Sequence, residues 1–440
     1  MLKYKKTITL IASFFFVLIG SMHAQPLQKR VYSLNAVIDS AIANNFKLKA
    51  SMLNDSLTLK EIEIIARNYK PRITALASYS YWDWLMPNKA KLLGENVKTD
   101  MYIELSAYQL IYDWGRTRQN KLLQESDINI NREFIRLLRQ NISTSVTLVY
   151  LEALKSLKKI EVLNNTLSQL KSHLEIARNL YNIGKVSQID LLKIQVEIRV
   201  TEKELTTAEN NYLEQLTNLV NLAQIKGDTD FSLEENTANL YEKTKLFFTD
   251  TMLVSMSQNH PVLKSYDEKL AREKILESLY KKQSNPEVFS YMTTNWESAY
   301  IPFSKNFNYN IGAGIRYTLP YWSGGSYHDR IAQSRIRSDQ LQNSRMDEYL
   351  NLKREFDALV VQQKNKIQEI ESNREIILIA NKSLDNILIM YESGQESILN
   401  LLDAQTILTK QKILYEQSII EYLELIARIN YVCGIDNLPY

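Results

Sequence analysis

The chain has 440 residues, of which 45% are hydrophobic and 23% are charged. This composition excludes a disordered chain and a continuously membrane-embedded one, and the length suggests two or three domains. Only 11 glycines and 8 prolines occur, which favours long helices over many loops. The single cysteine, Cys433, leaves an exported chain without an internal disulfide, so stability must come from packing or assembly.

The first 24 residues have the pattern of a secretory signal peptide. Three lysines precede an apolar run over 8–20, and Ala24 stands before the expected cleavage point. A transmembrane anchor is the alternative, but the run is short for a membrane span. Removal of residues 1–24 takes away three lysines and no acids, which leaves equal numbers of basic and acidic residues. This balance gives no support to a nucleic-acid-binding surface.

A helix followed by two strands is predicted next. Ser33 is a suitable N-cap for a helix that reaches about Tyr69, and Pro71 ends it. Apolar and polar residues then alternate over 73–81 and again over 101–108, beyond a turn-like region at 85–99. Because alternation with a period of two is typical of strands, these segments predict a strand hairpin.

The stretch from Gly115 to about Ala223 predicts a helical hairpin. Apolar or small residues step by four and three on both sides of Gly184, the spacing that keeps one stripe of a helix against a partner. The glycine ends the first arm and Ser187 caps the second. The first arm, which ends at Tyr181, would be about 100 Å long at roughly 1.5 Å per residue. An ordinary globular core does not need such a helix, so the hairpin must span something.

The same order of elements is predicted a second time in the C-terminal half. Four pairs of matching positions recur in the same order at a nearly constant separation, which indicates an internal repeat. The pairs are Asn44 with Asn259, Pro71 with Pro286, Gly184 with Gly394, and Asp190 with Asn400. The sequence therefore predicts a signal peptide at 1–24, a first repeat at 25–228 and a second at 229–440, with its own strands at about 287–296 and 308–321.

The last predicted strand has one apolar and one polar face. Tyr309, Ile311 and Ile315 share one face, whereas Asn310 and Arg316 share the other. This pattern is typical of a membrane barrel strand between lipid and lumen, although a soluble sandwich strand can also have it. In lipid every strand edge must be paired, and four strands cannot close. Three copies would supply twelve strands, a size that closes around a water-filled interior.

These ordered features resemble a known family. The motifs are Asn44-Asn-Phe, Asn259-His-Pro, Gln109-Leu-Ile-Tyr-Asp-Trp-Gly-Arg116, Leu319-Pro-Tyr-Trp-Ser-Gly-Gly325, and two Tyr-x-x-Gly turns followed by Asp/Asn-Leu-Leu. Over about 33–435 the chain is similar to the outer-membrane efflux protein family typified by TolC. Leu110 and Trp114 depart from the family, which often has Pro and Gly there.

The resemblance implies an α+β fold in which a trimer forms a 12-stranded barrel in the outer membrane and a long helical barrel across the periplasm. It implies a passive exit duct for tripartite efflux or type I secretion, with a periplasmic adaptor protein and an inner-membrane pump as partners. The adaptor would dock at the two helical tips, and the periplasmic mouth would close just before them. Arg316 is expected to face the lumen. The expected docking residues are Tyr181, Gly184, Lys185, Ser187, Tyr391, Gly394, Gln395 and Ser397, and the candidate gate residues are Asp385, Glu175 and Arg178.

No pattern of catalytic, cofactor-binding or metal-ligating residues is found in the sequence. His173, His260 and His328 lack metal-ligand spacing and are expected to be satisfied surface imidazoles. An enzyme is therefore not expected, and neither is a cofactor. A periplasmic adaptor and a soluble coiled-coil scaffold are the alternative functions. An adaptor would lack the duplicated strand pairs, and a scaffold would have no use for a two-faced strand.

Overall fold

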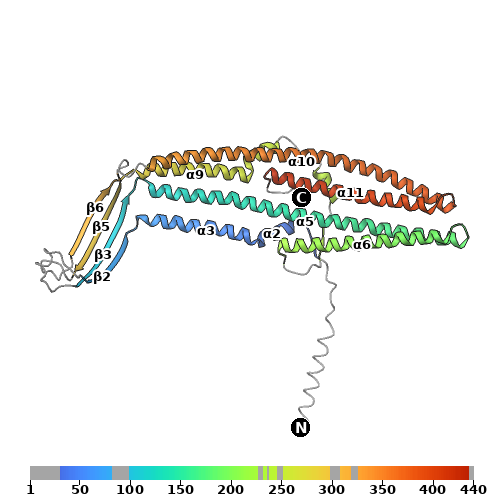
Figure 1. Ribbon diagram of the computed structural model, residues 1–440, viewed down its shortest axis with the longest axis horizontal. Helices are drawn as coiled ribbons and strands as arrows, with labels where there is room; N and C mark the ends of the chain where they lie inside the picture. The colour runs from blue at the N-terminus through green and yellow to red at the C-terminus, as the bar shows by residue number, and fades with distance from the viewer. Residues whose placement is uncertain are drawn as a thin grey trace, which may run out of the picture.

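The computed structural model describes residues 30–81, 99–225, 231–234, 237–244, 251–297, 308–318 and 326–435. It is an elongated α+β molecule, with a four-stranded sheet at one end and two helical hairpins that turn at the other (Figure 1). The predicted signal peptide, most of the turn at 85–99 and the motif at 319–325 lie outside the described residues.

The first helical segment is two helices instead of the single predicted one. Helix α2 (Leu34–Asn44) begins after Ser33, whose side chain accepts a hydrogen bond from the Ala36 amide. Asn45 then leaves the helical conformation, and its side chain caps α3 (Phe46–Ala66) by accepting from the Leu48 amide at 2.9 Å. The prediction of an unbroken helix was wrong because an asparagine that caps a new helix competes with continuation of the old one.

The predicted helical hairpin is confirmed. Helix α5 (Arg116–Asn182) has 67 residues and α6 (Gln188–Ala223) returns beside it. Ser187 caps α6 in a capping box, because its side chain accepts from the Asp190 amide while the Asp190 carboxylate accepts from the Ser187 amide.

The second half contains a matching long hairpin and several shorter elements. Helix α10 (Ser326–Ser393) has 68 residues, and α11 (Ile398–Val432) returns beside it. The shorter helices are α7 (Thr237–Thr244), α8 (Thr251–Asn259) and α9 (Pro261–Gln283). A small parallel pair, β1 (Arg30–Tyr32) with β4 (Phe231–Leu233), was not predicted from the sequence.

All four long strands join one antiparallel sheet in the order β2-β3-β5-β6. The predicted strand hairpin of the first half is confirmed, and β3 also pairs with β5, which joins the two halves of the chain. The strands are β2 (Arg72–Tyr81), β3 (Thr99–Tyr112), β5 (Glu287–Glu297) and β6 (Asn308–Arg316).

The long helices form a wall with two levels. Near the sheet, α3 and α9 pack on α5, whereas toward the tips α6 and α11 take these places (Figure 1). Between the two levels, the end of each return helix meets a shorter helix: α6 meets α2, and α11 meets the start of α9. Ser40 donates to the Ala223 carbonyl at 3.4 Å in the first half, and Gly434 approaches His260 in the second. Both junctions use a residue in the left-handed region, Gln224 at φ 49° and Gly434 at φ 68°.

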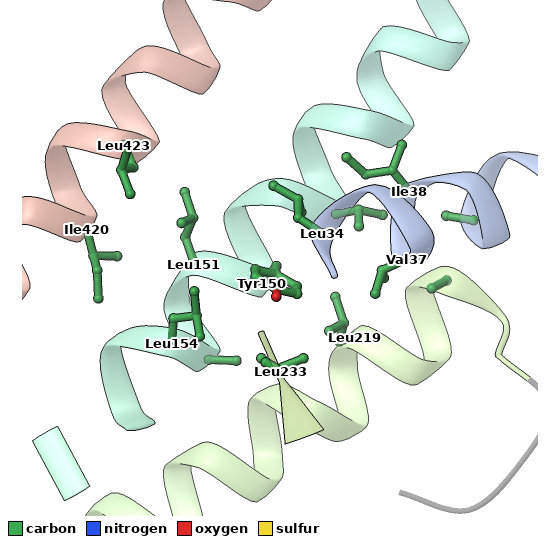
Figure 2. Packing of buried hydrophobic residues seen from close by; sticks show 14 of the residues in the cluster. Leu34, Val37, Ile38, Tyr150, Leu151, Leu154, Leu219, Leu233, Ile420 and Leu423 are labelled. Atoms are coloured by element: carbon green, nitrogen blue, oxygen red, sulfur yellow. The ribbon is translucent and has the colours of Figure 1, made fainter. Parts of the chain in front are cut away.

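The largest buried cluster lies at this middle level. Figure 2 shows Val37, Leu154 and Leu219 converging from α2, α5 and α6. The hydroxyl of Tyr150 lies 3.1 Å from the Tyr32 carbonyl and 3.0 Å from the carbonyl of Glu234. The core therefore anchors β1 and the end of β4 as well as the helices.

A second buried cluster fills the hairpins near the tips, where Leu170, Ile194 and Leu401 are fully buried. Within the described ranges, no helix combines the length and the apolarity that a membrane-crossing helix needs.

Candidate functional site

The four strands place residues of the same kind side by side across the sheet. Ile73, Ala107, Met292 and Ile311 are consecutive partners in one row. Ile73 and Ile311 are 68% and 67% exposed, so this row packs against nothing within the protomer. The other large apolar residues exposed on the same face are Tyr79, Tyr81, Met101, Ile103, Leu105, Tyr309, Ile315 and Tyr317. This face of the sheet is therefore uncovered and mostly apolar, with Gln109, Ser290 and Thr294 as its polar members.

The opposite face is mostly polar, although Leu76 and several aromatic rings also lie on it. The adjacent row consists of Thr74, Ser106, Thr293 and Asn310, one residue from each strand. The alternation predicted for the last strand thus extends over the whole sheet. The chain pairs these strands so that all four apolar sets face the same way, because a slip of one residue would reverse a strand's faces.

Two glycines on the polar face leave room for aromatic rings. A Cβ on Gly312 would lie 2.6 Å from the ring of Tyr291, and a Cβ on Gly314 would lie 2.9 Å from the ring of Phe289. The rings of these two residues therefore cover the last strand. The Gly-Ala-Gly sequence is explained by this cross-strand packing.

Arg316 lies on the polar face, as its alternation predicts. Its guanidinium donates to Glu287 on the neighbouring strand at 2.8 Å, and it also lies 4.9 Å from the centre of the Phe289 ring. Arg116, at the start of α5, donates to the other oxygen of Glu287 at 2.6 Å. One carboxylate therefore connects the sheet to the first residue of the long helix, a link that the sequence pattern did not reveal.

The motif between β3 and α5 builds the corner where the sheet joins the helices. Asp113 is buried and accepts from the amides of Gly115 and Thr117 at 3.0 and 2.7 Å. Tyr69 donates to the same carboxylate at 2.5 Å. Trp114 has φ 52° and Gly115 φ 83°, so the chain turns in the left-handed region. Asp113 therefore satisfies the otherwise unpaired first amides of α5.

The two predicted turns lie at the end of the molecule farthest from the sheet (Figure 1). Gly184 and Gly394 have φ 79° and 80°, a region that disfavours residues with a Cβ. The Lys185 amide donates to the Leu180 carbonyl at 2.9 Å, and the Gln395 amide donates to Met390 at 2.8 Å. Both turns thus have the hydrogen bonds of a glycine-ended helix.

Most of the predicted docking residues are exposed. Gly184, Lys185 and Ser187 are exposed at the first tip, and Gly394, Gln395 and Ser397 at the second. Ser397 caps α11 as Ser187 caps α6.

The two tip tyrosines differ in their environment. Tyr181 is 42% exposed, whereas Tyr391 is only 1% exposed and packs in the cluster near the tips. Tyr391 therefore supports its turn from inside, so its predicted part in docking would be to hold the tip and not to touch a partner. The sequence gives both tyrosines the same position before a glycine, so it could not separate them.

The candidate gate residues are also exposed within the protomer. Glu175 and Arg178 lie on α5 and Asp385 lies on α10, all within a few turns of the tips. Across the part of the chain that the structure describes, no ion pair joins these three side chains. A single copy thus leaves them open to a neighbouring molecule or to solvent.

Two of the histidines are buried, so the expectation of surface imidazoles was wrong for them. His173 is 4% exposed, with Nε2 3.3 Å from Oε1 of Gln405. His260 is 1% exposed and caps α9, since its Nδ1 accepts from the Val262 amide at 3.3 Å. Burial lowers the pKa of His173, and it lowers that of His260 to about 4. The alignment of His260 with the capping Asn45 was a signal of this role.

Clusters of three or more potential metal ligands are absent from the described residues. The arrangement defines an elongated protein with one exposed apolar sheet face, two open sheet edges and a wall of helices about 100 Å long at roughly 1.5 Å per residue. This combination is typical of the class of membrane-inserted channels that long helices extend.

The comparisons with known proteins agree with this class. Residues 37–223 match the model of the outer membrane efflux protein family. The chain is similar to the outer membrane efflux protein BepC of Brucella suis biovar 1 (strain 1330), with 18% identity over 396 residues. The match covers 88% of this chain and 82% of BepC. The resemblance to outer-membrane efflux proteins, inferred from the motifs, is confirmed.

Several solved channels share the fold. The match to CusC has a TM-score of 0.74 and 14% identity, and it covers 91% of this chain and 92% of CusC. The outer-membrane channel OprN gives a TM-score of 0.71 at 14% identity, with 91% and 89% covered. The outer membrane protein VceC of Vibrio cholerae gives 0.69 at 14% identity, with 91% and 96% covered.

Proposed function

We propose that this protein is an outer-membrane efflux channel-tunnel, in which three copies form the passive exit duct of a tripartite efflux or type I secretion system. The observation that carries this proposal is the sheet. Its apolar face is exposed along all four strands, at one end of a wall of very long helices. An apolar face of this kind suits contact with lipid and not with water.

The open edges of the sheet support a closed ring of copies. Strands β2 and β6 each have one paired side only, and an unpaired edge is costly in lipid. Pairing of β6 in one copy with β2 in the next removes every edge. Three copies then give twelve strands with the polar face, including Arg316, toward a water-filled lumen.

Tandem duplication accounts for the way the chain supplies these parts. Each half contributes a capped helix, two strands, a helix of nearly seventy residues, a glycine turn and a return helix. We place the boundary near residue 228, so that the halves are 25–228 and 229–440. Matching end-to-end junctions at Gln224 and Gly434 support this division.

The helical wall extends away from the membrane into the periplasm in this proposal. The tips would then lie about 100 Å from the sheet, at roughly 1.5 Å per helical residue. Exposed Lys185 and Gln395 would contact a periplasmic adaptor protein, which connects the duct to an inner-membrane pump.

The ring is tested by the state of the detergent-extracted protein. We expect a trimer by light scattering, ion channels in a planar bilayer, and extraction from membranes by detergent only. A stable monomer would overturn the proposed ring. Release by a salt wash without detergent would instead favour the coiled-coil scaffold.

The docking surface is tested by site-specific crosslinking in cells. Lys185→Cys and Gln395→Cys, in a Cys433→Ala background, are expected to crosslink to the adaptor. Cys433 is the one cysteine of the sequence, so its replacement leaves the introduced cysteine as the only thiol. Lys203→Cys, exposed on α6 away from the tip, is the control. Equal crosslinking to the adaptor at all three positions would contradict docking at the tips.

The proposed gate is tested by cation block. Threefold symmetry would bring three copies of Asp385 together, and like charges held close attract multivalent cations. Trivalent cations are expected to block the wild-type channel, and Asp385→Ala is expected to lose this block. Asp403→Ala, an exposed acid on α11, is the control. Unchanged block in the Asp385 variant would place the gate elsewhere, with Glu175 and Arg178 the next residues to replace.

A further inference from the structure

A cavity of about 680 Å³ lies at the corner where the sheet meets the helices. Four basic side chains and one carboxylate line it, together with apolar and aromatic groups. The charged residues are Arg67, Lys70, Arg72, Arg316 and Glu287.

The carboxylate in this cavity is already neutralised. Glu287 accepts from Arg116 at 2.6 Å and from Arg316 at 2.8 Å, one arginine on each oxygen. Stacking on the Phe289 ring also holds Arg316 in place. Glu287 is therefore not available to balance the other cations.

The remaining three basic groups have no anion of their own. Arg67, Lys70 and Arg72 are exposed, and in the described ranges none of them forms an ion pair. The charge of Arg67 helps to lower the pKa of Glu63, but the Glu63 carboxylate is already bound by Lys60 at 2.9 Å. The cavity therefore keeps an excess of positive charge.

We infer that this cavity binds the anionic groups of exported molecules, namely phosphates or carboxylates. A planar guanidinium group can donate two parallel hydrogen bonds to two oxygens of either anion, and lysine adds a mobile charge. The inference rests on the proposed channel, because it needs the polar face to line the lumen. Arg72, Tyr108, Glu287 and Arg316 all lie on that face, opposite the apolar row.

The threefold ring would multiply the effect of each cavity. Three cavities at one level surround the lumen with basic groups, which raises the local concentration of anions in a confined channel. At an ionic strength of 0.1 M the screening length is about 10 Å, and it falls to about 3 Å at 1 M. Anion preference should therefore be strong in dilute salt and weak in concentrated salt.

The test compares two variants that each remove two exposed positive charges. Arg67→Gln/Arg72→Gln removes them from the cavity, and Lys47→Gln/Lys49→Gln removes them from the far end of α3. Block of single channels by inorganic tripolyphosphate is expected to weaken at least about tenfold in the cavity variant only, since charged hydrogen bonds are lost. The reversal potential in a KCl gradient should move toward cation preference in the same variant.

Charge-conserving replacements guard against a merely structural effect. Arg67→Lys/Arg72→Lys is expected to retain part of the block, because the positive charges remain although the paired guanidinium hydrogen bonds are lost. Equal loss of block in this variant would overturn the inference of an anion site based on charge. Equal loss in the Lys47/Lys49 control would overturn it as well.

The lipid composition of the bilayer distinguishes the two possible sources of the anion, which are an exported molecule and a lipid headgroup. Cargo binding in the lumen predicts the same tripolyphosphate block in phosphatidylcholine bilayers with and without phosphatidylglycerol. If the block is lost only in the bilayers that contain phosphatidylglycerol, a lipid headgroup occupies the cavity and the inference is overturned.

Calorimetry separates failure of this site from failure of the channel. Tripolyphosphate is titrated into the detergent-extracted protein, where conduction plays no part. Binding to the wild type that is lost in Arg67→Gln/Arg72→Gln supports the site even if the protein conducts no ions. The absence of conduction would contradict only the proposed duct. Conducting channels without tripolyphosphate binding would overturn the site and leave the duct intact.

Discussion

The sheet and the helical wall of this chain meet their surroundings in opposite ways. The wall has its own core, in which Leu154 and Leu219 are almost completely buried between helices. The sheet has an apolar face as well, but Ile73, Ile311 and Ile315 remain about two-thirds exposed on it. Burial of apolar surface stabilises a fold at roughly 25 cal/mol per Å². The wall can therefore hold together as a single copy, whereas the sheet depends on contacts outside it.

The largest effect is expected from reversing the polarity of the apolar face. Ile311→Arg should abolish trimer assembly, because an arginine that faces lipid near the midplane costs about 2–4 kcal/mol in each of three copies. Asn310→Arg places the same side chain one residue away, on the polar face, and should assemble normally. Trimer yield on detergent gels measures both.

The opposite outcome would reverse the assignment of the two faces. If Asn310→Arg fails to assemble while Ile311→Arg is harmless, the polar face would be the one in contact with lipid. Arg316→Leu adds a third check, since a lumen-facing residue can be lost without loss of the trimer. It should change conductance instead.

The next largest effect is expected in the core of the wall. Leu154→Ala should lower the free energy of unfolding by about 2–5 kcal/mol, because it leaves a cavity among packed helices. Leu213→Ala removes a leucine that is 55% exposed on α6 and should cost much less. Loss of helical circular dichroism with urea measures both variants. Equal losses would mean that the wall, like the sheet, is completed by other copies.

The sequence could predict the parts of each region that depend on neighbouring residues. The turns at Gly184 and Gly394 and the period of two in the strands are local patterns, and both are confirmed. The union of the two strand pairs into one sheet, by contrast, depends on contacts across nearly two hundred residues. The same holds for Glu287, which Arg116 and Arg316 share, and for the pairing of β1 with β4.

The candidate site was predictable to a similar extent. Arg316 could be assigned to the polar face because alternation alone determines it. The burial of Tyr391 and His173 could not be predicted from the sequence, because it depends on which helices pack against α10 and α5. A charged or aromatic residue on a long helix has the same local pattern in either case. The basic cavity was also missed, since its residues come from the end of α3, from η1 (Arg67–Tyr69) and from all four strands of the sheet.

The two residues that cap α3 and α9, Asn45 and His260, occupy matching positions in the two halves, and only the second should make stability depend on pH. Asn45 does not titrate, whereas the pKa of His260 is lowered from 6.5 to about 4, chiefly by burial. The folded state therefore disfavours the protonated imidazole. Its contribution to stability is complete above pH 6.5 and falls by about 3 kcal/mol as the pH drops toward 4. Urea unfolding at a series of pH values measures this loss.

The matched control uses the residue found at the other junction. His260→Asn keeps a side chain that can cap α9 but removes the titration. This variant should lose less stability than the wild type between pH 6.5 and 4. If both lose the same amount, other groups cause the acid sensitivity, with the buried His173 the first to replace.

The smallest effect is expected at the tips. Gly184→Ala should destabilise its turn by about 1 kcal/mol, because φ 79° is unfavourable for alanine while no neighbour lies within 4 Å of the added Cβ. Gly434→Ala should cost more, since its Cβ would lie 2.7 Å from the Cα of His260. Faster hydrogen exchange at the Lys185 amide, which donates to Leu180, measures the loosened turn. Lys185→Ala, which leaves the glycine in place, should not change exchange in the preceding turn. Unchanged exchange in Gly184→Ala would mean that the packing of the two hairpins, and not the glycine, fixes the tip.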